Sequence, residues 1–215
     1  MSIVQLCVCF ILGYIFGNIP NGYLYAKSQG VDIYHQGSGN PGSTNVLRTL
    51  GKRAGITVLL MDIAKCMVPI FLMILFWKPA NEDQKTLILM LTGIGAILGH
   101  NFPILPGVKG GKGVACTGAL LIALAPLYTL GLLCFFILIV LTTKYVSLGS
   151  VLSVFVFFLS VLLMGKSGIL FPFSGAIYLP MCGLSLFLAL LCLFQHRENM
   201  KRLMNGTENK FGKNK

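Results

Sequence analysis

The sequence predicts an all-α fold, a polytopic transmembrane helical bundle, and three observations indicate this fold class. Of the 215 residues, 55% are hydrophobic and only 11% are charged, whereas a soluble domain carries about 25% charged residues. The mean hydropathy is +0.81. The apolar residues also fall in long runs instead of alternating with polar ones, so a water-soluble fold would expose most of them. We therefore expect residues 1–215 to form a single integral membrane domain.

The apolar runs predict where the spans lie. A bilayer core of about 30 Å requires roughly 20 helical residues, and five runs are suitable: 3–25, 54–77, 86–99, 147–164 and 176–195. The third run is short but can extend back toward Glu82. The segment 113–141 is too long for one upright span, and Pro126 near its middle breaks or kinks a helix. Two shorter helices that meet at Ala125–Pro126 bring the expected number of spans to seven.

The basic residues predict the orientation in the membrane. With seven spans, one side of the membrane receives the loops 26–53, 100–112 and 142–146 and the tail from residue 196. That side carries thirteen of the 17 Lys and Arg residues, as cytoplasmic loops do. We therefore expect an external N-terminus and a cytoplasmic C-terminus. The thirteen residues are Lys27, Arg48, Lys52, Arg53, Lys109, Lys112, Lys144, Arg197, Lys201, Arg202, Lys210, Lys213 and Lys215.

The net charge of +11 has several readings. It would suggest nucleic acid in a soluble protein, but in a membrane protein it more often reflects basic cytoplasmic loops. Anionic membrane lipids or a phosphorylated substrate would also suit it, and no nucleic-acid partner is predicted. No metal or nucleotide site is visible, because no cysteine pair has metal-ligand spacing backed by histidines, and we predict no cofactor.

The first unusual polar stretch on the expected cytoplasmic side is 37–48. Its glycines permit positive φ angles and a close approach of the backbone to a ligand, and successive N–H groups in such a loop can bind an anion. Ser38, Thr44 and Asn45 add hydrogen-bond donors, and Arg48 offers a bidentate fork for a phosphate. The alternative is a flexible loop that caps the helix expected from about Lys52.

The second stretch is 99–113, which ends directly before an apolar helix. A Gly-Gly-Lys-Gly sequence at a helix start gathers backbone N–H groups, the positive helix end and an ammonium group around one point, which suits a phosphate. It is not a Walker A loop, because Pro106 replaces the first glycine and Gly113 follows the lysine. The alternative is a basic turn that anchors the helix at the lipid headgroups. The candidate ligand-binding residues are His100, Asn101, Lys109, Gly110, Gly111, Lys112 and Gly113.

The third stretch, 196–208, begins where the last span ends. On a continuing helix His196 and Asn199 share a face, whereas Glu198 and Arg202 can pair on another face. A basic tail next to a membrane usually binds acidic lipid, which is the alternative reading of this stretch.

Two charged residues lie inside the second span. Asp62 and Lys65 are three residues apart, and charges inside a membrane are costly and usually paired and functional. The pair could hold helices together or border the site.

These stretches resemble the bacterial acyl-phosphate:glycerol-3-phosphate acyltransferase family, whose three cytoplasmic motifs appear here in order. Stretch 37–48 resembles the first motif, with the spacing of Asn40, Thr44, Asn45 and Arg48. Stretch 99–113 resembles the second motif, and His196, Asn199, Arg202, Gly206 and Glu208 resemble the third. The Asp62–Lys65 pair is also similar to a recurrent feature of the family. The resemblance spans nearly the whole chain.

The resemblance implies the reaction. The family transfers a fatty acyl group from acyl phosphate to the 1-hydroxyl of glycerol 3-phosphate, giving lysophosphatidic acid and phosphate. It acts at the cytoplasmic face of the bacterial cytoplasmic membrane, and the enzyme that supplies acyl phosphate is an expected partner. Acyltransferases with soluble donors carry a His-x4-Asp motif, which is absent after His35, His100 and His196. An acyl phosphate is already a reactive mixed anhydride, so it requires positioning and charge neutralisation more than a strong base.

The resemblance also implies residue roles. Lys112 with its neighbouring glycines, Arg48 and Ser38 would bind the phosphate groups. His196 and Asn199 would orient the attacking hydroxyl, with either His196 or a phosphate oxygen of the donor accepting its proton. Glu208 would be structural and pair with a basic residue of the motif. An acyl-enzyme on Ser38 is the less favoured route, since no His–Asp pair is apparent to activate it.

A small transporter for an organic phosphate is the alternative function. Seven spans with clustered basic loops would permit it. Transporters place their sites near the middle of the membrane between internal repeats, whereas the polar stretches here gather at one face and no repeat is apparent.

Overall fold

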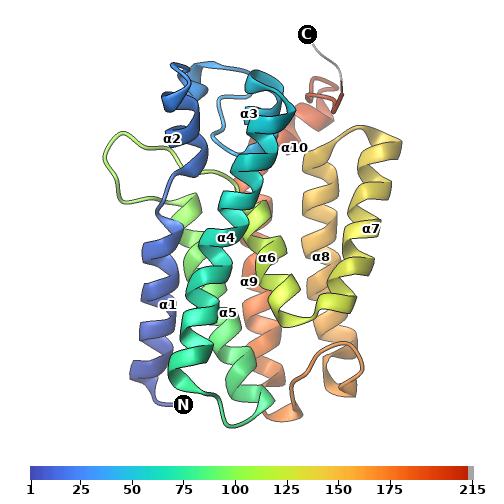
Figure 1. Ribbon diagram of the computed structural model, residues 1–215. Helices are drawn as coiled ribbons and strands as arrows, with labels where there is room; N and C mark the ends of the chain where they lie inside the picture. The colour runs from blue at the N-terminus through green and yellow to red at the C-terminus, as the bar shows by residue number, and fades with distance from the viewer. Residues whose placement is uncertain (213–215) are drawn as a thin grey trace. The chain divides into compact units, whose positions relative to one another are not determined.

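The computed structural model describes residues 1–212, which form helices joined by turns and loops, without a strand (Figure 1). The α-helices are α1 (Ile3–Gly17), α2 (Asn21–Ser28), α3 (Ser43–Leu50), α4 (Lys52–Trp77), α5 (Glu82–Asn101), α6 (Val114–Leu124), α7 (Pro126–Thr143), α8 (Val146–Met164), α9 (Tyr178–Gln195) and α10 (Arg197–Met204). Three short 3-10 helices are η1 (Ile33–His35), η2 (Gly165–Ser167) and η3 (Gly175–Ile177). The all-α prediction is confirmed for this part of the chain, and Lys213 and Lys215 of the charge count lie outside it.

The helix lengths bear on the predicted spans. Five segments within the described residues are long and apolar enough to cross a membrane: Ile3–Ser28, Lys52–Trp77, Pro126–Thr143, Val146–Ser167 and Gly175–Gln195. The predicted division of segment 113–141 is confirmed, because α6 ends at Leu124 and α7 begins at Pro126. A proline is tolerated at the first position of a helix, where its missing N–H has no partner to lose. α5 begins at Glu82, so the short run 86–99 does extend back to this residue, as predicted. The count of seven spans stays a prediction.

The first predicted span, 3–25, is not one continuous helix. α1 ends at Gly17 and α2 begins at Asn21, so residues 18–20 separate two helices. Asn18 stabilises this break with its side chain, which donates to the Tyr14 carbonyl at 2.7 Å and accepts from the Ile104 N–H at 2.7 Å. Pro20, which has no N–H to give to a helix, follows. The apolar run therefore contains a built-in interruption close to the polar loops.

The chain folds into two compact units. Unit 1 comprises Met1–Ala80 and Leu87–Leu120, and unit 2 comprises Asn81–Thr86 and the described part of Leu121–Lys215. Within unit 1, glycines let α1 and α5 approach closely. A Cβ atom at Gly13 would lie 2.0 Å from the Thr92 carbonyl oxygen, and one at Gly99 would lie 2.2 Å from the Tyr14 carbonyl oxygen. Small residues at such an interface are the usual basis of close helix packing in membranes.

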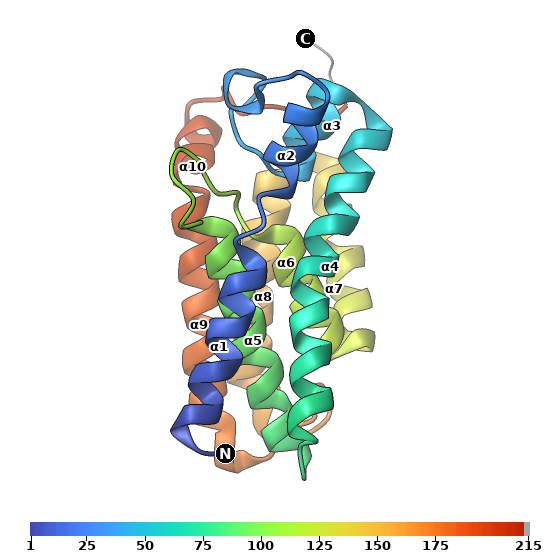
Figure 2. The ribbon, with the colours of Figure 1, turned by 60° about the vertical axis from the view of Figure 1, so that its left-hand side comes forward.

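The elements that carry the first polar stretch pack against the start of α4. Figures 1 and 2 show α2 and α3 at the end of unit 1 where α4 begins, and α3 contacts α4 directly. A small buried core lies among these elements and η1, and it is made of Ala26, Ile33, Val46, Ala54 and Val58. This core fixes the backbone on both sides of the stretch 37–48.

Unit 2 contains the last three long helices and α10. α8 packs against α7 and against α9, and α10 contacts both α8 and α9. Tyr128, Phe157 and Phe171 form a cluster of aromatic rings with centroids 5.1–6.3 Å apart. The contacts of α10 with α8 and α9 hold the beginning of the third polar stretch.

Many large apolar side chains point out of the helices toward their surroundings. Leu127 is 86% exposed, Leu163 77% and Phe76 73%. Side chains of this kind are costly in water but suit the hydrocarbon core of a bilayer. They agree with helices that lie in a membrane.

Candidate active site

The first polar stretch is shaped by the side chain of Asn45. Its Oδ1 accepts from the Ser38 N–H at 2.8 Å, and its Nδ2 donates to the Gln36 carbonyl at 2.9 Å. Gly37 has a φ of 58°, and a Cβ atom there would lie 2.2 Å from Asn45 Oδ1, so only glycine suits this position. The carboxamide of Asn45, expected to bind substrate, is thus engaged in holding the loop.

The second half of this stretch is helical, which corrects the expectation of a loop, whereas the helix expected from about Lys52 is confirmed as α4. Gly42 precedes α3, and its N–H donates to Asn40 Oδ1 at 2.9 Å. Gly42 is the extended N-cap residue of α3, a position that glycine commonly occupies, and no side chain caps the helix there. Thr44 and Arg48 are one turn apart on α3 and half-buried, whereas Ser38 is exposed. These three side chains and the N-terminus of α3 can face a ligand.

A His–Asp pair lies just before Ser38, although none was apparent from the sequence. His35 Nδ1 is 2.7 Å from Asp32 Oδ2. The hydrogen bond from His35 holds the pKa of Asp32 below its usual value. The two side chains are 83% and 57% exposed, and exposed ion pairs contribute little stability in water.

The second polar stretch combines a helix end, a loop and a helix start. His100 and Asn101 are the last residues of α5, and Gly113 directly precedes α6. Gly113 has a φ of 75°, and its carbonyl accepts from the Thr117 N–H at 2.8 Å. The predicted position of Gly-Gly-Lys-Gly at a helix start is therefore correct. Lys112 is held one residue before this turn, beside the positive end of α6.

Gly110 and Gly111 bring the loop against the end of α5. A Cβ atom at Gly110 would lie 2.1 Å from the Asn101 carbonyl oxygen, and one at Gly111 would lie 2.1 Å from His100 Nε2. The Gly111 N–H donates to the His100 carbonyl at 3.1 Å. The Asn101 side chain is buried beside Gly113, and neither its Nδ2 nor its Oδ1 has a hydrogen-bond partner in the described chain. The glycines are thus required by space as well as by flexibility.

Replacing Gly110 with alanine is expected to displace the loop. Its Cβ would meet a backbone oxygen, which cannot move aside as a side chain can, so overpacking of about 1–3 kcal/mol is expected. If this loop contacts a substrate, a displacement of about 1 Å can lower the rate by about 100-fold. Enzyme turnover and melting temperature of the purified variant measure both effects.

Gly118→Ala is the matched control for Gly110→Ala. Gly118 lies in α6, where a Cβ atom would have no neighbour within 4 Å, and alanine favours a helix by about 1 kcal/mol over glycine. Turnover of Gly118→Ala should stay at the wild-type level. Unchanged turnover in Gly110→Ala would show that the loop backbone is not part of the site.

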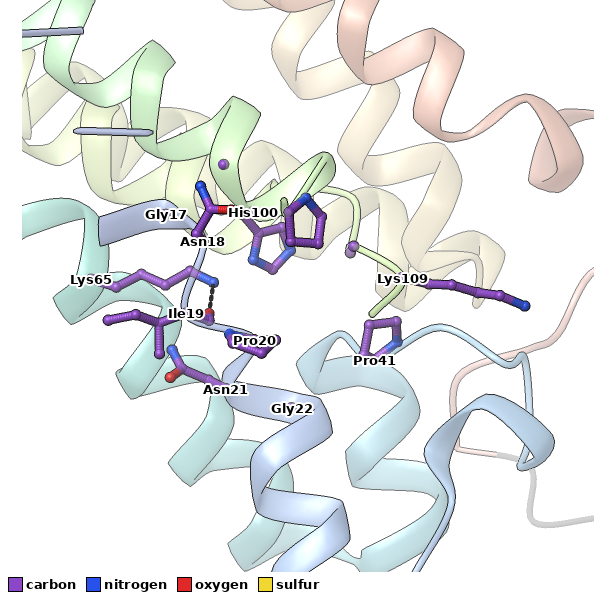
Figure 3. Close-up of a pocket in the computed structure, with 14 residues that line it drawn as sticks. Gly17, Asn18, Ile19, Pro20, Asn21, Gly22, Pro41, Lys65, His100 and Lys109 are labelled. Carbon is purple, nitrogen blue, oxygen red and sulfur yellow. Dashed lines mark hydrogen bonds between the residues drawn. The ribbon is translucent and has the colours of Figure 1, made fainter. Parts of the chain in front are cut away.

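The second stretch contacts η1, just before the first stretch, and shares a pocket with the first stretch within unit 1. The Tyr34 hydroxyl accepts from the Lys109 N–H at 3.0 Å and donates to the Lys109 carbonyl at 3.1 Å. Both stretches also line one pocket, with Pro41 from the first and His100, Lys109, Gly110 and Gly111 from the second (Figure 3). In Figure 3 the Lys109 side chain extends away from His100. Tyr34 was missed by the sequence analysis, because nothing in its surroundings distinguishes it from an ordinary loop tyrosine.

The intramembrane charges also reach this pocket. Lys65 Nζ is 3.0 Å from Asp62 Oδ1, and both side chains are 3% exposed. Lys65 is part of the pocket lining together with the break between α1 and α2. The pair thus lies beside the place where the first two stretches meet.

The third polar stretch lies in unit 2 and is organised by Glu208. Asn199 Nδ2 and Ser147 Oγ donate to Glu208 Oε1 at 2.7 and 3.0 Å, and Arg202 Nε donates to Oε2 at 2.8 Å. Burial would raise the pKa of Glu208, but these hydrogen bonds outweigh it and hold the pKa below the usual glutamate value. Glu208 fixes the orientation of the Asn199 carboxamide, because Nδ2 must face the carboxylate.

The predicted Glu198–Arg202 pair is wrong. Arg202 binds Glu208, and Glu198 is 3.1 Å from Lys201 Nζ. Glu208 is buried and therefore offers Arg202 a less screened charge than the exposed Glu198 does. Helical spacing alone could not predict that Glu208 would bind Arg202 in place of Glu198.

The Glu208 contacts predict a pH-dependent stability. A carboxyl group whose pKa is depressed in the folded state stabilises the fold at pH values above its pKa in the unfolded chain, about 4.3. This stabilisation is lost as the pH falls through the lower pKa of the folded state. Glu208→Gln is expected to lose about 2 kcal/mol at neutral pH and to show a flatter decline of melting temperature in acid. Parallel curves for variant and wild type would contradict this expectation.

His196 occupies the junction between α9 and α10. It ends α9 and precedes α10, so the helix expected to continue through it is interrupted at this residue. The side chain is 2% exposed, and its Nδ1 lies 2.8 Å from the Cys192 carbonyl. A carbonyl only accepts, so Nδ1 carries the proton in the neutral ring and Nε2 carries the lone pair. His196 is thereby oriented as an acceptor through Nε2.

No group of three His, Cys, Asp or Glu side chains suited to a metal ion occurs among residues 1–212. The helices and loops together define an integral membrane protein of several apolar helices, with glycine-rich basic loops of the kind that bind phosphate.

The comparisons with known proteins name the family. The family described as "Glycerol-3-phosphate acyltransferase" matches residues 7–206. A glycerol-3-phosphate acyltransferase of Clostridioides difficile (strain 630) is 40% identical over 217 residues, with 100% of each chain covered. One of Geobacter sulfurreducens is 40% identical, with 93% of this chain and 94% of the relative covered. The chain belongs to the glycerol-3-phosphate acyltransferase family.

Solved structures agree with this family. The crystal structure of PlsY (YgiH), an integral membrane glycerol 3-phosphate acyltransferase in its glycerol 3-phosphate form, is 32% identical with a TM-score of 0.81, and 96% of both chains is covered. The lysophosphatidic acid form of PlsY has a TM-score of 0.79 at 32% identity, covering 96% of this chain and 95% of PlsY. None of these relatives supports the transporter alternative.

Proposed function

We propose that this enzyme transfers a fatty acyl group from acyl phosphate to the 1-hydroxyl of glycerol 3-phosphate, the first acylation step of phospholipid biosynthesis. The products are lysophosphatidic acid and inorganic phosphate. The observation that carries the proposal is one pocket of unit 1 that both glycine-rich stretches line, with Pro41 from the first and Lys109, Gly110 and Gly111 from the second. Both substrates are phosphate esters or anhydrides, and such loops suit their anionic groups.

The phosphate groups are bound by the first two stretches. Lys112 lies beside the N-terminus of α6. Ser38 lies in the loop before α3, and Arg48 lies in the last turn of α3. Backbone N–H groups at these helix starts add partial positive charge. Binding of this kind neutralises the leaving phosphate as the anhydride bond breaks, which lowers the barrier more than a strong base would. Asn40 and Asn45 serve the same site by holding the loop.

The attacking hydroxyl is oriented by His196 and Asn199. Nε2 of His196 carries the lone pair and can accept the hydroxyl proton, and the Asn199 carboxamide is fixed by Glu208. The oxygen of the hydroxyl then attacks the carbonyl carbon of the acyl phosphate. The carbon–oxygen bond to phosphate breaks, and the proton passes to His196 or to a phosphate oxygen. Acyl transfer is direct, so no acyl-enzyme forms on Ser38, and failure to trap one would agree with this route.

The protein belongs in the bacterial cytoplasmic membrane as one acyltransferase domain of seven spans. The helix break before Pro126 supports this count, and the basic stretches support a cytoplasmic site with an external N-terminus and a cytoplasmic C-terminus. The acyl chain of the donor would remain in the bilayer. The enzyme that supplies acyl phosphate is the expected partner.

Phosphate release by the purified protein tests the proposal. Palmitoyl phosphate would be supplied with and without glycerol 3-phosphate, and the lipid product would be identified. Release that requires glycerol 3-phosphate and yields lysophosphatidic acid is the expected result. Folded protein that releases no phosphate in response to the acceptor would refute the proposed reaction.

A further inference from the structure

A buried cluster of polar side chains connects α4 with the second polar stretch of unit 1. Its centre is the Asp62–Lys65 pair, one turn apart on α4 and 3% exposed at each residue. Separating such charges from water is costly, and the cost is recovered only when their remaining polar atoms also find partners. The other partners of the pair therefore indicate what it stabilises.

One set of partners lies at the break between α1 and α2. Lys65 Nζ donates to the Ile19 carbonyl at 2.8 Å, which Figure 3 marks with a dashed line, and Asn21 Nδ2 donates to Asp62 Oδ1 at 3.1 Å. The backbone of Gly22, beyond this break, packs closely against the first polar stretch, because a Cβ atom at Gly22 would lie 1.7 Å from the Pro41 carbonyl oxygen. The pair thus holds the segment against which the first stretch rests.

The other partner is His100. Its Nδ1 lies 3.7 Å from Asp62 Oδ1, and its side chain is 9% exposed. On its other side the ring lies against the loop, since a Cβ atom at Gly111 would be 2.1 Å from Nε2. The ring of His100 therefore stands between the buried carboxylate and the backbone that leads to Lys112.

We propose that Asp62 and Lys65 are positioning residues, which fix the His100 ring and the break at residues 18–20 and thereby preset both phosphate-binding stretches. The inference rests on the proposed function for the identity of the substrates. The pair contacts His100, Asn21 and Ile19 directly and would act on substrate only through them. Groups that orient the residues of a site contribute to it by reducing reorganisation on binding.

The test is the double variant Asp62→Asn/Lys65→Met, which removes both charges together and leaves no unpaired buried ion. We expect the KM for at least one of the two phosphate substrates to rise about tenfold or more, with a smaller change in kcat. A purely structural role would lower the amount of folded enzyme and leave the KM values of the folded fraction unchanged. Unchanged KM values would overturn the proposal.

The exposed pair Glu82–Lys85 provides a matched control. It has the same acid–lysine spacing on a helix, with Nζ 3.2 Å from Oε2, but its side chains are 56% and 43% exposed. Glu82→Gln/Lys85→Met should therefore keep wild-type KM values. An equal rise in both double variants would show a general effect of charge removal and would overturn the proposal.

A binding measurement separates this inference from the proposed reaction. Inorganic phosphate and glycerol 3-phosphate should each raise the melting temperature of the wild type, and this rise should be reduced in Asp62→Asn/Lys65→Met. If these anions stabilise the wild type but it shows no turnover, the proposed reaction is refuted, and the comparison of the melting temperatures still tests the positioning role of Asp62 and Lys65. If neither anion stabilises the wild type, both the proposed reaction and the positioning role are refuted.

Asn21→Ser provides a milder test if the double variant does not fold. It removes one donor to Asp62 without creating an unpaired charge. A rise of about threefold in the same KM is expected for the loss of one hydrogen bond. Wild-type KM values in folded Asn21→Ser would overturn the proposal.

Discussion

Replacing Lys112 with alanine is expected to lower acceptor-dependent phosphate release by about 100- to 1000-fold, the usual loss when one preorganised electrostatic group is removed. Lys112 precedes Gly113, whose φ of 75° turns the chain into α6. The backbone of Lys112 thus stands just before the start of α6, where the positive helix end and the loop backbone can bind a phosphate. The initial rate with saturating palmitoyl phosphate measures the loss.

The matched control for Lys112→Ala is Lys201→Ala. Lys201 is an exposed basic residue of α10 that pairs with Glu198 at 3.1 Å, so its removal changes the net charge by the same amount. Its turnover should stay within about twofold of the wild type, because an exposed pair contributes little. A Lys112→Ala enzyme with nearly normal turnover would exclude the second stretch as a phosphate site.

Replacing His196 with alanine is expected to lower kcat by about 100- to 10,000-fold if the imidazole accepts the hydroxyl proton, the range typical of general-base catalysis. The Cys192 carbonyl holds Nδ1 at 2.8 Å, which leaves Nε2 as the basic atom. If a phosphate oxygen of the donor accepts the proton instead, the loss should be smaller and should appear mainly in the KM for glycerol 3-phosphate. The split between kcat and KM therefore decides between the two proton acceptors.

His35→Ala is the control histidine variant. His35 is 83% exposed and pairs with Asp32, so its removal should leave kcat unchanged under direct acyl transfer. A loss in His35→Ala as large as that in His196→Ala would contradict this expectation. It would favour the acyl-enzyme route, in which the His35–Asp32 pair activates Ser38.

Local sequence was sufficient for much of the fold. Long apolar runs require helices in a bilayer, because every backbone polar group must find a partner within its own segment. Pro126 has no N–H and therefore marked the boundary between α6 and α7 in advance. The break after α1 coincides with the polar residues Asn18 and Asn21, which flank Pro20, although the run was expected to continue as one span to residue 25.

The candidate site was predictable in its residue types but not in their contacts. The density of glycine, lysine and amide residues indicated phosphate chemistry, because those residue types supply N–H donors and charge. Helical spacing suggested a Glu198–Arg202 pair, yet Arg202 binds Glu208. Spacing describes only neighbours on one helix, whereas Glu208 returns from beyond the helix end and offers a buried charge.

The sequence by itself determined the membrane class, the main helices, the division at Pro126 and the three polar stretches, because each depends on residues close together in the chain. Only the tertiary structure decided which of those residues meet. Tyr34 binds Lys109 across 75 positions and Asn21 binds Asp62 across 41. Such contacts arise when helices pack, and packing is set by the combined shapes of distant segments, which no local pattern records.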